Sequence, residues 1–381
     1  MRVLHLIRTA GFGGAERVLL NGIPALREEG IDACVGVLDP GHEDENVFLQ
    51  MLKEHQVPWL RYVDRGRLQP TKILKLAMRL KKQRIDILHV HGYRAAMYGL
   101  PAARMAGCKV LLTRHGVLSR HVRERMVEEV ERVLSEQMDA IVPVAEHLKG
   151  SNDTLSRVIH NCIPIPSKSS CSYPGNNPRK LLYVGRLSQE KAPFFLIDAF
   201  AEVQERVPDV TLDIVGDGPL FGEVERYIRV RNLSSHVTLH GFMEPTPFYE
   251  KSDVLVISSK REGLPMVALE AMSYGLPVVS TDVGGMSTLL GGCIPAGLLA
   301  PSDDLSAFAR QINSLLMISG LARAFGQQAR KRIVNRHHLQ RWAQEHAALY
   351  DELYVQRTHS HHPDMLDRLL HWSKSPIEMK L

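Results

Sequence analysis

The sequence predicts an α/β protein with two doubly wound domains, and three observations lead to that prediction. Apolar runs of strand length alternate with helical patterns from Val3 to about residue 335. This alternation is typical of right-handed βαβ units around a parallel sheet. A stretch with four prolines and many Ser and Asn residues, 163–178, interrupts it near the middle. The length of 381 residues is sufficient for two domains.

Composition limits the classes of protein that the chain can be. A hydrophobic content of 44% and a charged content of 23% are ordinary for a globular protein in water. The net charge of +5 permits an anionic ligand or membrane surface without requiring one, and we expect no nucleic-acid partner. The five cysteines are scattered, with no C-x-x-C pair, which favours reduced thiols. Without a signal peptide or an apolar run of about 18 residues, we expect a cytoplasmic protein, with any membrane contact peripheral on the inner face.

The first predicted domain covers residues 1–165. Its first strand, Val3–Ile7, leads through a glycine-rich loop into a helix at Ala15–Glu29, whose apolar residues recur at helical spacing. Further strands are expected at Ile31–Leu38, Trp59–Val63, Ile87–His91, Val110–Thr113 and Ala140–Val144. Helices are expected between them at Glu45–His55, Thr71–Gln83, Arg94–Ala106 and His121–Gln137. Each helix would cross from one parallel strand to the next.

After the predicted linker, 166–178, the alternation restarts in a second domain, 179–335. Its strands are expected at Lys180–Val184, Val210–Val215, Val237–Leu239, Val254–Ile257 and Leu276–Ser280. Its helices are expected at Ala192–Arg206, Leu220–Val230, Pro247–Lys251, Pro265–Tyr274, Leu305–Met317 and Leu321–Val334. Ligands of doubly wound sheets bind at the carboxyl ends of the strands, so the cleft between two such domains is the expected site.

A last helix, 336–357, is expected to pack back on the first domain. One side of it carries Trp342, Ala343, His346, Leu349, Tyr350 and Leu353. The polar tail, 358–381, holds His359, His361 and His362, for which a solvated tail is favoured over metal binding. We therefore predict no metal site and assign the tail no function.

Two acidic residues flank the start of the predicted helix Pro265–Tyr274. Glu262 precedes the helix, Glu270 lies within it, and Pro265 is expected at the first helical position. The free N–H groups of a helix start form an anion site. Solvent exposure is the alternative for a helical glutamate, but the neighbours of Glu270 are almost all apolar, and a charge buried there is costly unless something binds it. This pattern favours a site for a phosphorylated, hydroxyl-rich ligand.

A basic turn opens the second domain. Arg186 and Lys191 flank the turn between a strand and a helix. A planar guanidinium and a compact ammonium together suit a diphosphate, whereas the alternative is an ordinary surface turn. Gly216 and Gly218 follow the next strand and allow either a tight turn or close approach to a ligand.

The first domain offers weaker candidates. Gly13 and Gly14 lie in the loop after the first strand, but Glu16 stands where the dinucleotide fingerprint requires glycine. The loop can still present N–H groups to an anion. His115 follows a strand and is therefore expected at the cleft edge, where a structural histidine is the alternative; Arg114 and Gly116 beside it favour a site.

Taken together, these motifs resemble family 4 of the retaining GT-B glycosyltransferases, also called glycosyl transferases group 1. The likeness covers residues 1–335 and follows the family's order: GFGGAERVLLN, TRHG, VGRLSQEKAP, IVGDGP, HGF and SSKREGLPMVALEAMSYGLPVVSTDVGG. It implies a GT-B fold with two Rossmann-like domains facing a central cleft. The first would bind the acceptor and the second the nucleotide-sugar donor.

The resemblance also implies roles for individual residues. Arg186 and Lys191 would grip the donor diphosphate, and Glu270 would hold the ribose. Glu262, with the backbone of Gly263, Leu264, Pro265, Met266 and Val267, would face the donor sugar and the β-phosphate. Gly13 and Gly14 would approach the diphosphate, and His115 would contact the transferred sugar. The catalytic set would be His115, Glu262, Arg186 and Lys191. In one departure, Ala192 and Pro193 follow Lys191 where the family usually has glycine first. In another, the linker reads Ile159–Pro164 instead of a strand followed by P-N-G.

The implied reaction is retaining transfer of a hexose or N-acetylhexosamine from a nucleotide-diphosphate sugar to a saccharide or lipid-linked acceptor, in cell-envelope or exopolysaccharide biosynthesis. The nucleotide sugar is a co-substrate and no cofactor is expected. No Asp-x-Asp is placed at a strand end, so no metal is required. A sugar-nucleotide epimerase and a non-catalytic nucleotide-binding module are the alternatives. Two basic stretches could touch an anionic membrane or be solvated faces: Lys72, Lys75, Arg79, Lys81 and Lys82, and Arg120, Arg123 and Arg125.

Overall fold

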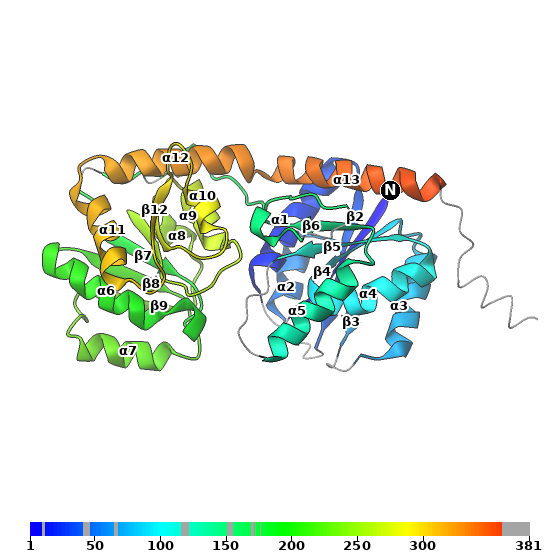
Figure 1. Ribbon diagram of the computed structural model, residues 1–381, viewed down its shortest axis with the longest axis horizontal. Helices are drawn as coiled ribbons and strands as arrows, with labels where there is room; N and C mark the ends of the chain where they lie inside the picture. Colours follow the sequence, from blue (N-terminus) through cyan, green and yellow to red (C-terminus); the bar gives the residue numbers. More distant parts are fainter. Residues whose placement is uncertain are drawn as a thin grey trace, which may run out of the picture. The chain divides into compact units, whose positions relative to one another are not determined.

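A computed structural model confirms the α/β prediction (Figure 1). It describes residues 1–9, 12–40, 46–64, 68–115, 122–150, 155–168, 171, 173–175 and 177–359, without the side chains of 122–128 and 357–359. The chain divides into two compact units: Met1–Cys162 with the chain from Leu339 onward, and Ile163–His338. Each unit is built on one six-stranded parallel sheet.

The sheet of the first unit has the strand order β3-β2-β1-β4-β5-β6. The strands are β1 (Arg2–Arg8), β2 (Asp32–Asp39), β3 (Trp59–Val63), β4 (Ile87–His91), β5 (Lys109–Arg114) and β6 (Ala140–Pro143). The order reverses between β1 and β4, which are hydrogen-bonded neighbours. In an open parallel sheet, this switch point is where ligands bind, beyond the carboxyl ends of the strands.

The α-helices in the described part of the first unit are α1 (Gly14–Glu28), α2 (Val47–Glu54), α3 (Pro70–Lys82), α4 (Gly92–Ala106), α5 (Val122–Ser135) and α13 (Leu339–His359). The last of them, α13, packs against α1. The contact is close because Gly22 faces the ring of Trp342, and a Cβ at Gly22 would lie 2.5 Å from that ring. The face that the sequence predicted for this helix, from Trp342 to Leu353, is buried.

The second unit repeats the same topology, with the strand order β12-β11-β10-β7-β8-β9. Its strands are β7 (Lys180–Val184), β8 (Thr211–Val215), β9 (Val237–Gly241), β10 (Val254–Ile257), β11 (Val278–Thr281) and β12 (Gly297–Ala300). The switch point lies between β7 and β10. The sequence did not predict β12, because a four-residue strand next to Pro301 gives a weak pattern.

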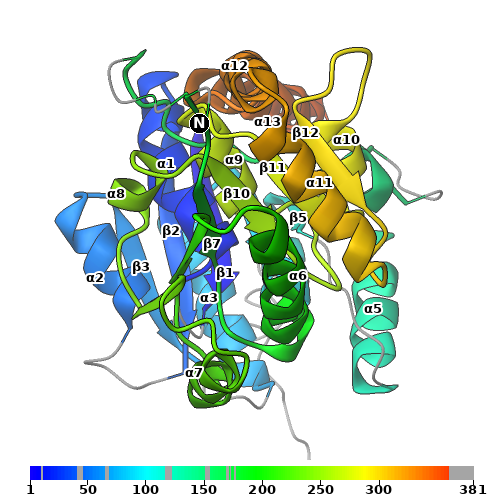
Figure 2. The ribbon, with the colours of Figure 1, turned by 90° about the vertical axis from the view of Figure 1, so that its left-hand side faces the viewer.

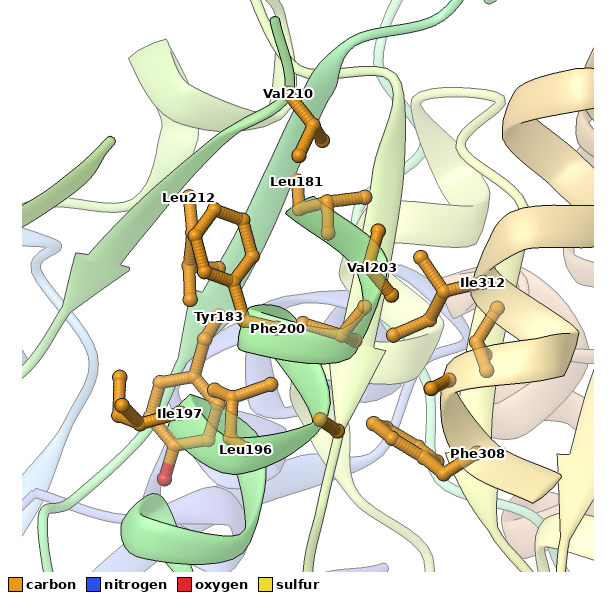
Figure 3. Packing of buried hydrophobic residues seen from close by; sticks show 14 of the residues in the cluster. Leu181, Tyr183, Leu196, Ile197, Phe200, Val203, Val210, Leu212, Phe308 and Ile312 are labelled. Carbon is orange, nitrogen blue, oxygen red and sulfur yellow. The ribbon is translucent and has the colours of Figure 1, made fainter. Parts of the chain in front are cut away.

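The helices of the second unit are α6 (Pro193–Arg206), α7 (Phe221–Val230), α8 (Thr246–Tyr249), α9 (Met266–Ser273), α10 (Met286–Leu290), α11 (Leu305–Met317) and α12 (Leu321–Arg336). Of these, the five-residue α10 was not predicted. α6 and α11 pack side by side on the sheet (Figure 2). Buried side chains of β7, β8, α6 and α11 form one cluster that includes Leu181, Leu212, Phe200 and Ile312 (Figure 3). This cluster joins two strands of the sheet to two of the helices that cover it.

Among the described helices, none combines the length and apolar composition that crossing a membrane requires. All five cysteines lie in the described part of the chain, and they are free thiols.

Candidate functional site

Lys191 and Glu262 meet at the switch point of the second unit. β7 ends at Val184, and the chain continues to a 3-10 helix, Gln189–Lys191; its neighbour β10 ends at Ile257 and continues to Glu262. The Nζ atom of Lys191 lies 2.5 Å from Oε1 of Glu262. The Lys191 side chain is 25% exposed and that of Glu262 10%. The structure thus brings together two of the four residues predicted to be catalytic.

Hydroxyl groups from strand ends hold this pair in place. The Ser259 hydroxyl donates to Oε1 of Glu262 at 2.6 Å, and the Thr281 hydroxyl donates to the Ser259 carbonyl at 2.5 Å. On the other side, the Ser258 hydroxyl donates to the Lys191 carbonyl at 2.9 Å. The sequence prediction missed all three residues, although two serines directly after a buried strand are a signal that could have been used.

A glycine loop supports the backbone beside Glu262. Gly284 has a φ of +55°, and a Cβ there would lie 2.0 Å from the Glu262 carbonyl oxygen. The Gly285 N–H donates to the Gly263 carbonyl at 2.7 Å. Only glycine allows the two loops to approach this closely.

Arg186 is exposed, and its guanidinium is among the charges that lower the pKa of the Glu190 carboxyl. The turn that carries it is fixed, because the Leu187 N–H donates to the Asp217 carbonyl at 2.9 Å. Gly216 has a φ of +139°, and a Cβ there would lie 2.0 Å from the Gly185 carbonyl oxygen. Gly216 therefore supports the arginine turn through tight packing.

The departure from the family at Ala192 falls on a strained residue. Ala192 is buried and has a φ of +47°, in the left-handed region that favours glycine. Pro193 follows as the first residue of α6, where its fixed φ suits a helix start.

We expect Ala192→Gly to raise the free energy of unfolding by about 0.5–1 kcal/mol, because glycine adopts this conformation without the alanine penalty. Urea denaturation of the two proteins measures the difference. Ala201→Gly, in the middle of α6, is the matched control and should lower stability by a similar amount. A loss of stability in Ala192→Gly would contradict the strain at this position.

Glu270 lies in α9 and is held by a tyrosine from α8. The hydroxyl of the buried Tyr249 donates to Oε2 of Glu270 at 2.8 Å. The Tyr249 ring stacks on the Tyr274 ring, with the ring centroids 5.6 Å apart. The sequence prediction missed Tyr249, because its role depends on the packing of α8 against α9. The partly exposed carboxylate is thus oriented by a neighbour instead of being free in solvent.

The start of α9 differs by one residue from the sequence expectation. Pro265 has a ψ of 123°, which is extended, so Pro265 is the cap and Met266 is the first helical residue; placing the proline at the first helical position was wrong. The first N–H groups of a helix, here those of Met266 and Val267, have no partner within the helix. Beside Glu262, Gly263, Leu264 and Val267 are partly exposed, whereas Pro265 and Met266 are buried.

In the first unit, Gly13 caps α1 and Gly14 is its first residue. Both are exposed, and Gly11 lies outside the described residues. The Gly13 N–H donates to Oε2 of Glu16 at 3.1 Å. This helix start, which attracts anions, already holds a carboxylate from its own first turn.

His115 follows β5 and is partly buried. Burial lowers the pKa of His115 to about 4, so its ring is neutral at pH 7. Its Nε2 lies 3.1 Å from Nδ1 of His91, the last residue of β4. Neighbouring Arg114 donates to the Leu148 carbonyl at 3.0 Å and so has a structural contact, while Gly116 lies outside the described residues.

Comparison with known proteins gives the same assignment over most of the chain. The family described as Glycosyltransferase Family 4 matches residues 12–165, and the family described as Glycosyl transferases group 1 matches residues 172–332. The chain belongs to the family 4 glycosyltransferases. This family 4 glycosyltransferase is 27% identical over 315 residues to the UDP-Gal:alpha-D-GlcNAc-diphosphoundecaprenol alpha-1,3-galactosyltransferase of Escherichia coli, covering 75% of this chain and 80% of the relative.

Solved structures support the GT-B fold of this glycosyltransferase. HepE from Anabaena, in complex with UDP, superposes with a TM-score of 0.77 at 22% identity, over 92% of this chain and all of that one. The lipopolysaccharide outer core galactosyltransferase WaaB, in its apo form, gives a TM-score of 0.72 at 19% identity, over 92% and 100% of the two chains. At this level of identity the likeness shows the fold alone.

Proposed function

We propose that this family 4 glycosyltransferase transfers a hexose or N-acetylhexosamine, with retention of anomeric configuration, from a nucleotide-diphosphate sugar to a saccharide or lipid-linked acceptor. The observation that carries the proposal is the Lys191–Glu262 pair at the switch point of the second unit, next to the start of α9. The Escherichia coli relative, named for a UDP-galactose donor and a diphosphoundecaprenol acceptor, supports the donor and acceptor classes. Cell-envelope or exopolysaccharide assembly in the cytoplasm is the proposed setting.

Each part of the site has a proposed task. Arg186 and Lys191 bind the donor diphosphate, and the N–H groups at the start of α9 add further donors. Glu270 accepts the ribose hydroxyls, with Tyr249 holding its carboxylate in place. Glu262 faces the donor sugar. From the first unit, Gly13 and Gly14 serve the diphosphate and His115 the transferred sugar.

The mechanism follows from where negative charge grows. As the glycosidic bond breaks, charge develops on the β-phosphate, and preorganised cations and N–H groups stabilise it. Glu262 holds Nζ of Lys191 in position before the donor arrives. The acceptor hydroxyl attacks from the face of the leaving group, and a phosphate oxygen takes its proton. These residues supply the electrostatic stabilisation themselves, so we propose that the reaction needs no metal ion.

The proposal is tested by incubating the protein with a panel of nucleotide sugars, with and without EDTA. We expect release of nucleoside diphosphate together with a glycosylated acceptor that keeps the anomeric configuration, and no loss of rate in EDTA. An isomerised nucleotide sugar would indicate an epimerase instead. Binding without turnover across the panel would indicate a nucleotide-binding module.

A peripheral membrane contact through α3 is part of the proposal; in the second basic stretch, Arg120 and the side chains of Arg123 and Arg125 lie outside the described residues. Leu74 and Met78 are 41% and 50% exposed, one helical turn apart, beside the exposed Lys75 and Arg79. Exposed apolar residues among cations suit an anionic lipid surface.

We expect Leu74→Ser/Met78→Ser to reduce sedimentation with phosphatidylglycerol vesicles by about tenfold. The control Val230→Ser removes an apolar side chain that is 70% exposed on the second unit and should change nothing. Equal sedimentation of all three proteins would refute the contact.

A further inference from the structure

A row of hydrogen-bonded side chains lies on one face of the first unit's sheet, and the proposed mechanism does not use it. The strand register places His5 of β1 beside His89 of β4, and Thr113 of β5 beside His91. Helix α13 covers this face with His346 and Tyr350. We call the following six residues the histidine chain: His115, His91, His5, Tyr350, His89 and Thr113.

Consecutive members of the histidine chain are joined by hydrogen bonds. Nε2 of His115 lies 3.1 Å from Nδ1 of His91, whose Nε2 lies 3.1 Å from Nδ1 of His5. Nε2 of His5 lies 3.1 Å from the Tyr350 hydroxyl, which lies 2.7 Å from Nδ1 of His89. Nε2 of His89 lies 2.5 Å from the Thr113 hydroxyl. The histidine chain therefore runs without a gap from partly buried His115 into the core.

Burial keeps the inner members neutral. His5 and His89 are 0% exposed and His91 is 6% exposed. For each of the three, burial holds the pKa well below its usual value, and the neighbouring imidazole of His346 lowers it further. A neutral imidazole carries one N–H and one lone pair. Each ring that donates on one side must therefore accept on the other.

When the Tyr350 hydroxyl likewise accepts on one side and donates on the other, two arrangements of the whole histidine chain result. In the first, every member donates toward His115, whose Nε2 accepts and whose hydrogen sits on Nδ1. In the second, every member donates toward Thr113; His115 then donates through Nε2 and keeps the lone pair on Nδ1. The tautomer of His115 is thus tied to groups buried on three strands and one helix.

A shared metal ion is the competing explanation. The ligand atoms of His5, His89 and His91 lie within 4.8 Å of one another. All six of their ring nitrogens already face a hydrogen-bond partner, so no lone pair is available without breaking the chain. The facing imidazole of His346 is engaged too, with Nδ1 2.9 Å from the Trp342 carbonyl oxygen. The hydrogen-bonded arrangement is therefore favoured.

We propose that His91, His5, Tyr350 and His89 are positioning residues that set the tautomer of His115, and thereby decide whether Nδ1 of His115 meets the transferred sugar as a donor or as an acceptor. The contact of His115 with the sugar rests on the proposed function; the control of its tautomer does not. With the wrong tautomer of His115, two donors or two acceptors would face each other at Nδ1, so a hydrogen bond to the sugar would be lost and replaced by repulsion.

The tautomer is measured directly on protein labelled with ¹⁵N-histidine, from long-range ¹H–¹⁵N spectra. In the wild type we expect His115 to populate one tautomer at about 90% or more, because the buried chain favours one direction. Tyr350→Phe removes the hydroxyl between His5 and His89, and should change the tautomer ratio of His115 by about fivefold or more. A folded Tyr350→Phe protein with an unchanged His115 tautomer would overturn the proposal.

Tyr98→Phe is the matched control. Tyr98 is a buried tyrosine of the same unit, its hydroxyl donates to Oδ1 of Asp64 at 2.9 Å, and it lies outside the histidine chain. The histidine spectra of the Tyr98→Phe protein should match those of the wild type. If Tyr350→Phe does not fold, Thr113→Val removes the far end of the chain with little change in shape and gives the same readout. Stoichiometric zinc in the purified protein that is lost in His5→Ala would also overturn the proposal, in favour of a metal site.

Kinetics separates this inference from the proposed function. We expect kcat of Tyr350→Phe to fall by about tenfold with the donor KM unchanged, as for one lost hydrogen bond in the transition state. A changed tautomer with full activity would mean that the tautomer of His115 does not affect the transfer of the sugar. That result would overturn the proposed effect on the sugar, but it would leave donor binding by Arg186 and Lys191 unaffected. Absence of any transferase activity in the wild type would instead refute the proposed function and leave the tautomer measurement valid.

Discussion

Replacing Arg186 by alanine is expected to lower kcat/KM for the nucleotide sugar by about 10²–10³, because it removes a charged donor from the leaving diphosphate. Stability should change by less than about 0.5 kcal/mol, since the side chain is exposed. Steady-state kinetics over the donor concentration and urea denaturation measure the two quantities. The combination of a large loss of activity with unchanged stability is expected of a residue whose partner is the ligand.

The matched control is Arg206→Ala. Arg206 is also exposed, but it ends α6, at the opposite edge of the sheet from the site. Removing its charge alters the net charge equally and should leave kcat/KM within about twofold. If Arg186→Ala also retained activity near the wild type, the diphosphate would have to bind elsewhere.

Lys191→Met is expected to damage both activity and stability. The variant loses a cation at the diphosphate and leaves the Glu262 carboxylate, 10% exposed, with the Ser259 hydroxyl in place of its ion pair. We expect kcat/KM to fall by about 10²–10³. The free energy of unfolding should fall by about 1–3 kcal/mol, the cost of a buried polar group that has lost its partner. Lys180→Met, at the exposed start of β7, is the control for loss of a lysine and should affect neither.

A double variant separates the two effects. Lys191→Met/Glu262→Gln removes the unpaired charge, so most of the lost stability should return while activity stays low. Recovery of activity in the double variant would show that the reaction needs neither the Lys191 ammonium nor the Glu262 carboxylate. In that case the lysine would have no direct role at the donor.

The sequence predicted most of the sheet strands for a physical reason. Strands buried on both faces of a parallel sheet are continuous apolar runs, as in β7 and β10, and they stand out from the amphipathic helices between them. The short β12 and α10 lacked the length to show a period. Lys191 and Glu262 follow the predicted strands β7 and β10, so the sequence could place them at the same end of the sheet, where the structure brings them together.

The supporting residues could not be found in this way. Ser259 and Tyr249 matter only because of partners that tertiary packing supplies. His89 and Tyr350 are separated by 261 positions in sequence. The sequence pattern around either residue does not indicate the hydrogen bond between them. From the sequence alone, a histidine within an apolar strand is an isolated polar residue. Its hydrogen-bond partners become known only from the folded structure.

The return of α13 to the first unit has a consequence for biosynthesis. His89 leaves the ribosome 261 residues ahead of the tyrosine that it will bond. At about 5–20 residues per second, the delay is roughly 13–50 seconds. Throughout that interval the nascent first unit lacks its covering helix, while the whole of the second unit, Ile163–His338, emerges. The unit whose synthesis begins first is therefore the last to be completed, and a fragment that stops at Cys162 would leave its buried histidines uncovered.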